Sequence, residues 1–244
     1  MTGRNIKLTI QYDGAGFSGW QYQPRLRTIQ GELETAIEKL TGKRETLYGA
    51  GRTDAGVSAL GQVANFRTAS RLPAKKLRDG LNFHLPSDIL IRAAEDAPDE
   101  FHARYDAICR RYEYRIGGRE TVVEHGRIWE VRGPLDRKRM EAAADLIMGE
   151  HDFSTFCVVA SRKPDNRCLV YRSRWVWEGE SGRYEITADR FLHTMIRSLV
   201  GAMVDLGRGR MTMRQFRTVF AAGDHRAIRH VAPAGGLCLI AVDY

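Results

Sequence analysis

Residues 49–66 constrain this chain more than any other segment, because they combine a glycine-rich stretch with a closely spaced acid and base. The charged residues are Arg52 and Asp54, and the glycines are Gly49, Gly51, Gly56 and Gly61. Glycine adopts backbone conformations that other residues disfavour, and it lets a ligand approach the main chain. The segment therefore indicates a loop that binds a charged ligand. The structural alternative is a turn in which Asp54 only caps the backbone.

The net charge points to a polyanionic partner. The chain has 244 residues, with 38 lysines and arginines against 30 acidic residues, which gives a net charge of +8. Such a charge favours binding to nucleic acid. An anionic membrane is the competing partner, but the basic residues are spread over many segments and not gathered on one amphipathic helix. The length fits one large domain or two small ones.

Several classes of protein are disfavoured by the sequence. The four cysteines, Cys109, Cys157, Cys168 and Cys238, form no close pair, so neither a zinc site nor a disulfide framework is expected. The first residues lack the apolar core of a signal peptide, and no apolar run reaches the ~18 residues of a membrane helix. We expect a cytoplasmic protein without a bound metal.

Hydrophobic periodicity predicts alternating strands and helices. Strands are predicted at residues 6–12, 62–66, 88–92, 106–116, 168–177, 183–188 and 237–244. Helices are predicted after Thr28, from Pro73, after Asp136 with a stop at Gly149, across 190–206, and after Thr212, whose spacing to Gln215 fits a capping box. These runs form two similar halves that meet near residues 95–105. The pattern favours an α+β fold with a mostly antiparallel sheet.

Residues 51–57, with the sequence GRTDAGV, resemble the active-site signature of tRNA pseudouridine synthases of the A type. Further motifs that resemble this family lie at residues 12–14, 19–24, 28–33, 81–86, 101–104, 110–114, 191–209 and 232–239. The resemblance implies two ferredoxin-like halves with joined, mostly antiparallel sheets, flanked by helices and separated by a basic central cleft. The N-terminal half, 1–103, would carry the catalytic loop, and the C-terminal half, 104–244, would complete the active-site cleft.

The resemblance also implies a reaction and a substrate. Members of this family isomerise uridine to pseudouridine in RNA without a cofactor, so none is expected here. The expected substrate is tRNA, with targets around positions 38–40 of the anticodon arm, and the expected assembly is a homodimer. The resemblance makes Asp54 the catalytic carboxylate. As an anion, Asp54 could attack the base or act on the ribose, and the sequence leaves this choice open.

The resemblance assigns substrate-binding roles to Arg52, Tyr112, Arg197 and Leu237. Arg52 would contact phosphate or occupy the place of the displaced base, although an ordinary ion pair is the alternative. Arg197 would form a salt bridge with Asp54, and its alternative is a position at the helix edge with its charge in solvent.

Tyr112 would contact the substrate, whereas Tyr114, on the same face of the predicted strand, is expected in the core. Leu237 would pack beside the target base, and on composition alone it belongs to the core.

RNA contacts are expected from two further segments. The first comprises Phe101, His102, Ala103, Arg104 and Tyr105. The second is a basic run that contains Arg162, Lys163, Arg167, Arg172 and Arg174, with only Asp165 opposing it in sequence. Basic loops commonly contact phosphates, and a solvated loop is the alternative. Ser58 stands where the family commonly has histidine, so a contact by that histidine is not expected.

Two other functions compete with the isomerase. An RNA-binding module without catalysis would share the charge and the aromatic residues but would not need Asp54. A carboxylate-dependent hydrolase acting on a phosphorylated substrate would normally need more clustered acids or a metal site.

Overall fold

The computed structural model describes residues 3–118 and 126–244. By its contacts the chain divides into two compact units. The first unit contains Met1–Ile108 and Cys238–Tyr244, and the second contains Cys109–Leu237. The division into functional halves at residues 1–103 and 104–244 stays a prediction. In the structure, residues 104–108 and the last strand group with the first unit.

The first unit contains a mostly antiparallel sheet. Its strands are β1 (Arg4–Tyr12), β2 (Tyr48–Gly49), β3 (Ser58–Thr68), β4 (Ile89–Ala97) and β10 (Leu237–Asp243). The strand order is β4–β1–β3–β10, with β2 also paired to β3. Strand β10 runs parallel to β3, and the other pairs are antiparallel. Because Ile6, Leu8 and Ile10 of β1 are buried while the residues between them are less so, the predicted alternation is confirmed.

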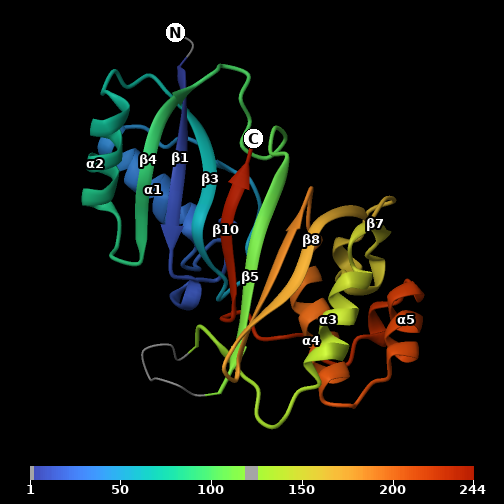
Figure 1. Cartoon of the computed structure of the whole chain (residues 1–244). Helices are drawn as coiled ribbons and strands as arrows, with labels where there is room; N and C mark the ends of the chain where they lie inside the picture. Colours follow the sequence, from blue (N-terminus) through green and yellow to red (C-terminus); the bar gives the residue numbers. More distant parts are fainter. Residues whose placement is uncertain (1–2, 119–125) are drawn as a thin grey trace. The chain divides into compact units, whose positions relative to one another are not determined.

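Helices α1 (Ile29–Thr41) and α2 (Ala74–His84) pack against each other beside this sheet (Figure 1). Thr28 caps α1 as predicted, since its hydroxyl accepts a hydrogen bond from the Gly31 N–H at 3.2 Å. Gly42 ends α1 in the left-handed conformation. Helix α2 starts one residue later than predicted, because Pro73 has an extended ψ of 146° and forms the N-cap.

The second unit contains another mostly antiparallel sheet. Its strands are β5 (Cys109–Gly117), β6 (Trp129–Glu130), β7 (Gly149–Asp152), β8 (Arg167–Glu178) and β9 (Ser181–Ala188). The order is β5–β9–β8–β7, and β6 pairs with β5 in parallel. Helices α3 (Arg137–Leu146), α4 (Met195–Gly207) and α5 (Met213–Ala221) pack together on one side of this sheet (Figure 1).

The helix caps predicted in the second unit are confirmed. The Asp136 carboxylate accepts from the Arg139 N–H at the start of α3. Thr212 and Gln215 form the capping box of α5, with each side chain bonded to the backbone of the other residue.

Three predicted boundaries in the second unit are wrong. Strand β5 begins at Cys109 and not at 106. Helix α3 ends at Leu146, and Gly149, with φ +93°, opens β7 instead of stopping the helix. Helix α4 begins at Met195 and not at 190, because Thr194 has φ +64° and a left-handed residue interrupts a right-handed helix.

The α+β class with mostly antiparallel strands is confirmed. The joining of the two sheets and the basic cleft stay predictions. None of the helices in residues 3–118 and 126–244 has the length and apolar character needed to cross a membrane.

Candidate active site

Asp54 lies in the connection between β2 and β3 of the first unit. Its carbonyl accepts a hydrogen bond from the Val57 N–H at 3.1 Å, which closes a tight turn, and Gly56 within that turn has φ +81°. Asp54 is half-buried, Arg52 is exposed and Thr53 between them is buried. The loop therefore presents an acid and a base at the surface while it anchors the residue between them.

Thr53 is the anchor of this loop. Its carbonyl accepts from the Trp20 N–H at 3.0 Å, and its Oγ1 lies 2.8 Å from the Tyr12 hydroxyl. Gln62, which is fully buried on β3, donates from Nε2 to the Gly51 carbonyl at 2.9 Å. Buried polar groups that are hydrogen-bonded rigidify the chain that carries them. Asp54 is thus held on a backbone whose position the core of the first unit fixes.

Gly14 and Gly19 lie in the segment after β1, residues 13–20, and they allow this segment to lie directly against the Asp54 loop. A Cβ on Gly14 would be 2.1 Å from the Val57 carbonyl oxygen, which is closer than real Cβ atoms approach. Gly19 has φ +94°, and a Cβ there would be 2.9 Å from the Thr53 carbonyl oxygen. Both positions therefore require glycine because the two backbones touch.

Ser58 also joins these two segments. Its Oγ accepts from the Gly14 N–H at 3.0 Å and lies 3.4 Å from Oδ1 of Asp13. The sequence identified Ser58 only as a departure from the family pattern. The structure gives it a packing role in the same place, linking the turn after β1 to the start of β3.

The sequence missed the residues that support Asp54. Tyr12, Trp20 and Gln62 are hydrogen-bonded to the loop at Thr53 and Gly51, and no role was assigned to any of these residues or to Thr53. Tyr12 and Trp20 lie 6.1 Å apart between ring centroids, and burial raises the pKa of the Tyr12 phenol. One signal was available, since Gln62 lies beside the apolar Val63 and Ala64 in a predicted strand, and a buried amide needs a partner.

The segment 101–105 forms a turn fixed to the sheet of the first unit. Phe101 packs against Tyr244 with ring centroids 5.1 Å apart. Ala103 is fully buried, its N–H donates to Asn65 Oδ1, and its carbonyl accepts from the Tyr244 hydroxyl. Ala103 therefore anchors the turn. Arg104 and Tyr105 are exposed, and His102 is partly buried.

In the second unit, Tyr112 and Tyr114 lie on the same face of β5, as predicted, and both are buried. Tyr112 is 8% exposed and meets Phe191 edge to face at 5.2 Å. Tyr114 is fully buried, and its hydroxyl donates to the Pro233 carbonyl at 2.7 Å. Its core position is confirmed, whereas substrate contact by Tyr112 stays a prediction.

Arg197 projects from α4 and is tied to the segment before β10. Its Nε donates to the Ala232 carbonyl at 2.8 Å, and the Ala232 N–H donates to the Arg197 carbonyl at 3.0 Å. In the last turn of α4, the Asp205 carboxylate accepts from His230 Nδ1 at 2.6 Å. These bonds fix the backbone that leads to Leu237, which is 6% exposed. The predicted salt bridge from Arg197 to Asp54 stays a prediction.

In the structure, carboxylates from outside the basic run also pair with its arginines. Arg172 and Arg174 both bind Glu185, at 2.7 and 2.8 Å. Arg167 binds Glu150 at 2.7 Å. These carboxylates are distant in sequence, and the register of β8 with its neighbours β7 and β9 brings them to the arginines.

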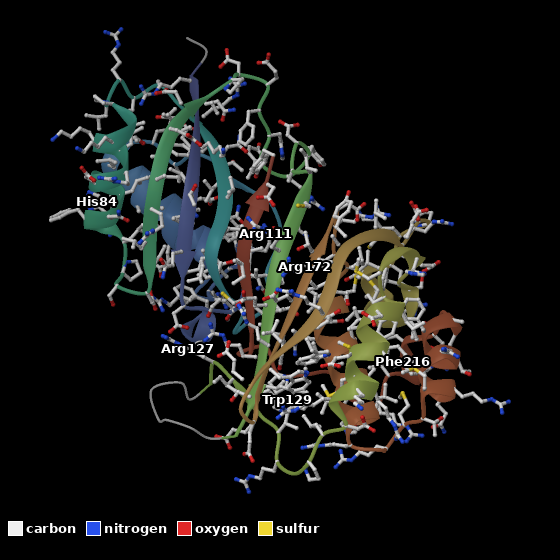
Figure 2. All side chains as sticks on the ribbon, viewed as in Figure 1. His84, Arg111, Arg127, Trp129, Arg172 and Phe216 are labelled. Atoms are coloured by element: carbon white, nitrogen blue, oxygen red, sulfur yellow. The ribbon has the colours of Figure 1, made fainter. Side chains whose placement is uncertain are left out.

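Two arginines lie on the exposed face of the second sheet, on strands either side of β9. Figure 2 shows Arg111 on β5 and Arg172 on β8, the two strands that flank β9. Both are in register with Thr187 of β9 and are exposed.

Arg162, in the loop before β8, differs from these exposed arginines. Its Nε and Nη2 atoms are buried and have no hydrogen-bond partner within residues 3–118 and 126–244. Lys163 is exposed. RNA contact by Arg162 and Lys163 stays a prediction.

Comparison with known proteins identifies the family. A family model described as tRNA pseudouridine synthase matches residues 8–106 and 143–244. The chain is 43% identical over 245 residues to tRNA pseudouridine synthase A of Rhodopseudomonas palustris (strain ATCC BAA-98 / CGA009), an alignment that covers 98% of this chain and 97% of the relative. It is 41% identical over 245 residues to tRNA pseudouridine synthase A of Maricaulis maris (strain MCS10), with the same coverage.

Among solved structures, the archaeal box H/ACA sRNP Nop10-Cbf5 complex matches 93% of this chain and 61% of its own chain, with a TM-score of 0.39 and 11% identity. The family model and the nearly full-length relatives are the decisive matches. On these matches, the chain belongs to the tRNA pseudouridine synthase family.

Proposed function

We propose that this protein isomerises uridine to pseudouridine in tRNA and that Asp54 is the catalytic carboxylate. The observation that carries the proposal is the Asp54 loop itself. The loop holds a half-buried carboxylate two residues from an exposed arginine, and buried hydrogen bonds at Thr53 fix its backbone. The chain that carries the loop belongs to the tRNA pseudouridine synthase family. A preorganised charged group stabilises a transition state without first being reorganised.

The reaction is a rearrangement within one nucleoside. The bond from N1 of uracil to C1′ of the ribose breaks, the base turns, and a bond from C5 to C1′ forms. The hydrogen on C5 leaves as a proton, and N1 gains one. No electron is gained or lost overall, so the chemistry needs no redox partner. In this proposal one carboxylate suffices. Asp54 serves by attacking the base or by acting on the ribose, and both routes remain open.

The other residues bind the substrate in this proposal. Arg52 contacts phosphate or fills the space of the displaced base. Tyr112, Arg197 and Leu237 contribute the remaining contacts to the target nucleotide. The RNA strand is held by exposed residues of the turn at 101–105 and by Arg162 and Lys163, while the buried Ala103 secures that turn.

We further propose that the targets are uridines around positions 38–40 of the anticodon arm. Some of these lie in or beside a stem, so the target nucleotide must leave its stack, at a cost of a few kcal/mol. The net charge of +8 offsets part of that cost through phosphate contacts. The proposal includes a homodimer that acts in the cytoplasm.

The test is an incubation of the purified protein with a full set of tRNAs labelled with tritium at C5 of uridine, without added cofactor. Release of tritium supports the isomerase. Binding of tRNA without release from any member of the set would support the RNA-binding module instead. Release of inorganic phosphate from a phosphorylated substrate would support the hydrolase. Sedimentation of the same preparation tests the homodimer.

A further inference from the structure

Helix α1 carries a buried polar pair, Gln30 and Glu34. The two residues are 8% and 7% exposed, and they lie on the same side of α1 because they are four positions apart. Gln30 Nε2 donates to Glu34 Oε1 at 2.9 Å. A buried carboxylate must be paired and hydrogen-bonded, and even then it adds little stability over an apolar residue of similar size. The pair therefore indicates a role beyond stability.

One partner of this pair is the segment that leads into β2. The Leu47 N–H donates to Glu34 Oε1 at 3.2 Å, and the Leu47 carbonyl accepts from Gln30 Nε2 at 3.3 Å. Arg44 Nη2 donates to the other carboxylate oxygen, Glu34 Oε2, at 3.2 Å. Leu47 is buried, so both of its polar backbone groups are satisfied by the pair on α1.

The other partner of Gln30 is the segment of residues 19–22. Gln30 Oε1 accepts from the Tyr22 N–H at 2.9 Å, and the Gln30 N–H donates to the Trp20 carbonyl at 3.0 Å. The Trp20 N–H donates to the Thr53 carbonyl at 3.0 Å. A chain of hydrogen bonds thus runs from the Gln30 amide to the backbone of the Asp54 loop.

These two segments border the Asp54 loop. The first runs from Leu47 through β2 and directly into the loop. The second lies against β2, because a Cβ on Gly49 would be only 2.6 Å from the Trp20 indole. The polar pair of α1 therefore fixes both the entry to the loop and the segment that lies against it.

We propose that Gln30 and Glu34 are positioning residues for Asp54, and that their hydrogen bonds hold the Asp54 loop in its reactive geometry. The inference rests on the proposed function, because it takes Asp54 as the catalytic carboxylate. A misplacement of about 1 Å can lower the rate of a reaction by about a hundredfold. Because both residues are buried, the pair acts on kcat through the loop and not by contact with tRNA.

The kinetic experiment measures tritium release from C5-labelled tRNA by Gln30→Met, Glu34→Met and Glu34→Gln. Both methionine variants keep the length of the side chain and remove its hydrogen bonds, so kcat falls by about 10- to 100-fold while the KM for tRNA stays within about twofold. Glu34→Gln restores most of the kcat lost in Glu34→Met, because its amide oxygen accepts from the Leu47 N–H.

Asn82 provides the matched control. It lies on α2, its Oδ1 accepts from the Ile91 N–H at 2.7 Å, and its Nδ2 donates to the Ile91 carbonyl at 2.9 Å. Like Gln30, it ties a helix to backbone groups through both ends of an amide, but its partner lies on β4, which β1 separates from β3. Asn82→Leu lowers the midpoint of urea unfolding as Gln30→Met does, and leaves kcat at the wild-type value.

Amide hydrogen exchange reports on the Asp54 loop without reference to activity. The N–H groups of Trp20 and Val57 donate to the carbonyls of Thr53 and Asp54, so their exchange rates measure how often the loop opens. Both groups exchange faster in Gln30→Met than in the wild type. In Asn82→Leu they exchange at the wild-type rate.

Three results overturn the positioning role. The first is a wild-type kcat for Gln30→Met, and the second is an equal loss of kcat in Asn82→Leu, which assigns the effect to stability. The third is unchanged exchange at Trp20 and Val57 in Gln30→Met.

The proposed function is judged separately, by tritium release from the wild type. Release by the wild type together with a normal kcat for Gln30→Met rejects only the positioning role. Absence of release from the wild type rejects the isomerase, and the exchange rates then still decide whether Gln30 and Glu34 hold the loop.

Discussion

The Tyr12 hydroxyl lies 2.8 Å from the Oγ1 of Thr53, the residue that precedes Asp54. Both residues are buried, so this hydrogen bond connects the core of the first unit directly to the loop that carries the proposed catalytic carboxylate. The first prediction follows from this hydrogen bond.

Replacement of Tyr12 by phenylalanine should lower both stability and kcat. The substitution removes the hydrogen bond between Tyr12 and the buried Thr53 hydroxyl. This loss should lower the free energy of unfolding by about 1–2 kcal/mol. Because Thr53 positions Asp54, kcat should fall by about tenfold or more while the KM for tRNA changes little. Denaturant unfolding and tritium-release kinetics measure the two effects.

Tyr184→Phe is the control for Tyr12→Phe. Tyr184 is fully buried, and its hydroxyl lies 2.7 Å from the Oγ of Ser173 in the second unit. Its loss should cost a similar free energy of unfolding without a change in kcat. Equal kcat values for the two variants would show that the Tyr12 bond serves stability alone.

Gly14→Ala should destabilise the protein far more than Gly51→Ala. The new Cβ at position 14 would meet the Val57 carbonyl oxygen at 2.1 Å, so the segment after β1, residues 13–20, must move away from the Asp54 loop. Overpacking of this kind costs about 1–3 kcal/mol. A Cβ on Gly51 meets no atom of the described residues within 4 Å, and the change there should stay within about 0.5 kcal/mol. Similar midpoints of urea unfolding for both variants would contradict the close contact.

Glu185→Gln should have an effect on stability that depends on pH. Partial burial tends to raise the pKa of Glu185, but hydrogen bonds from Arg174 and Arg172 and their charges outweigh it, so the pKa is lowered. A carboxylate with a lowered folded-state pKa adds stability above its unfolded-state pKa and loses that stability as the pH falls through the folded-state pKa. The wild type should therefore exceed the variant by about 1 kcal/mol at neutral pH, and by less near about pH 3.

Glu150→Gln is the control for Glu185→Gln. Glu150 pairs with Arg167, and both side chains are more than half exposed. Exposed pairs add about 0–1 kcal/mol, so this change should be nearly silent at both pH values. A difference between wild type and Glu185→Gln that grows on acidification would refute the lowered pKa.

The sequence predicted those features that depend on neighbouring residues. Alternation in β1 and the caps Thr28, Asp136 and Thr212 were all found where expected, because a strand face and a helix cap are read from residues only a few positions apart. The start of α4 was misplaced because the left-handed conformation of Thr194 cannot be read from an apolar run that continues through it.

Features that depend on strand register were not predictable. The partners of Arg172 and Arg174 follow from the pairing of β8 with β9, which brings Glu185 beside them. The support of the Asp54 loop depends likewise on a contact that is distant in sequence, because Tyr12 and Thr53 are 41 positions apart. Recognition of the Asp54 motif therefore gave the candidate residue, and the structure gave the reason for its fixed position.

The most direct measurement is tritium release from C5-labelled tRNA by Asp54→Ala and Asp54→Asn, with the Kd for tRNA measured on the same preparations. We predict that both variants release no tritium above background and bind tRNA within about threefold of wild type, because the carboxylate acts on the reacting nucleoside and contributes little to holding the RNA. Release at the wild-type rate by either folded variant would contradict the assignment of Asp54 as the catalytic residue.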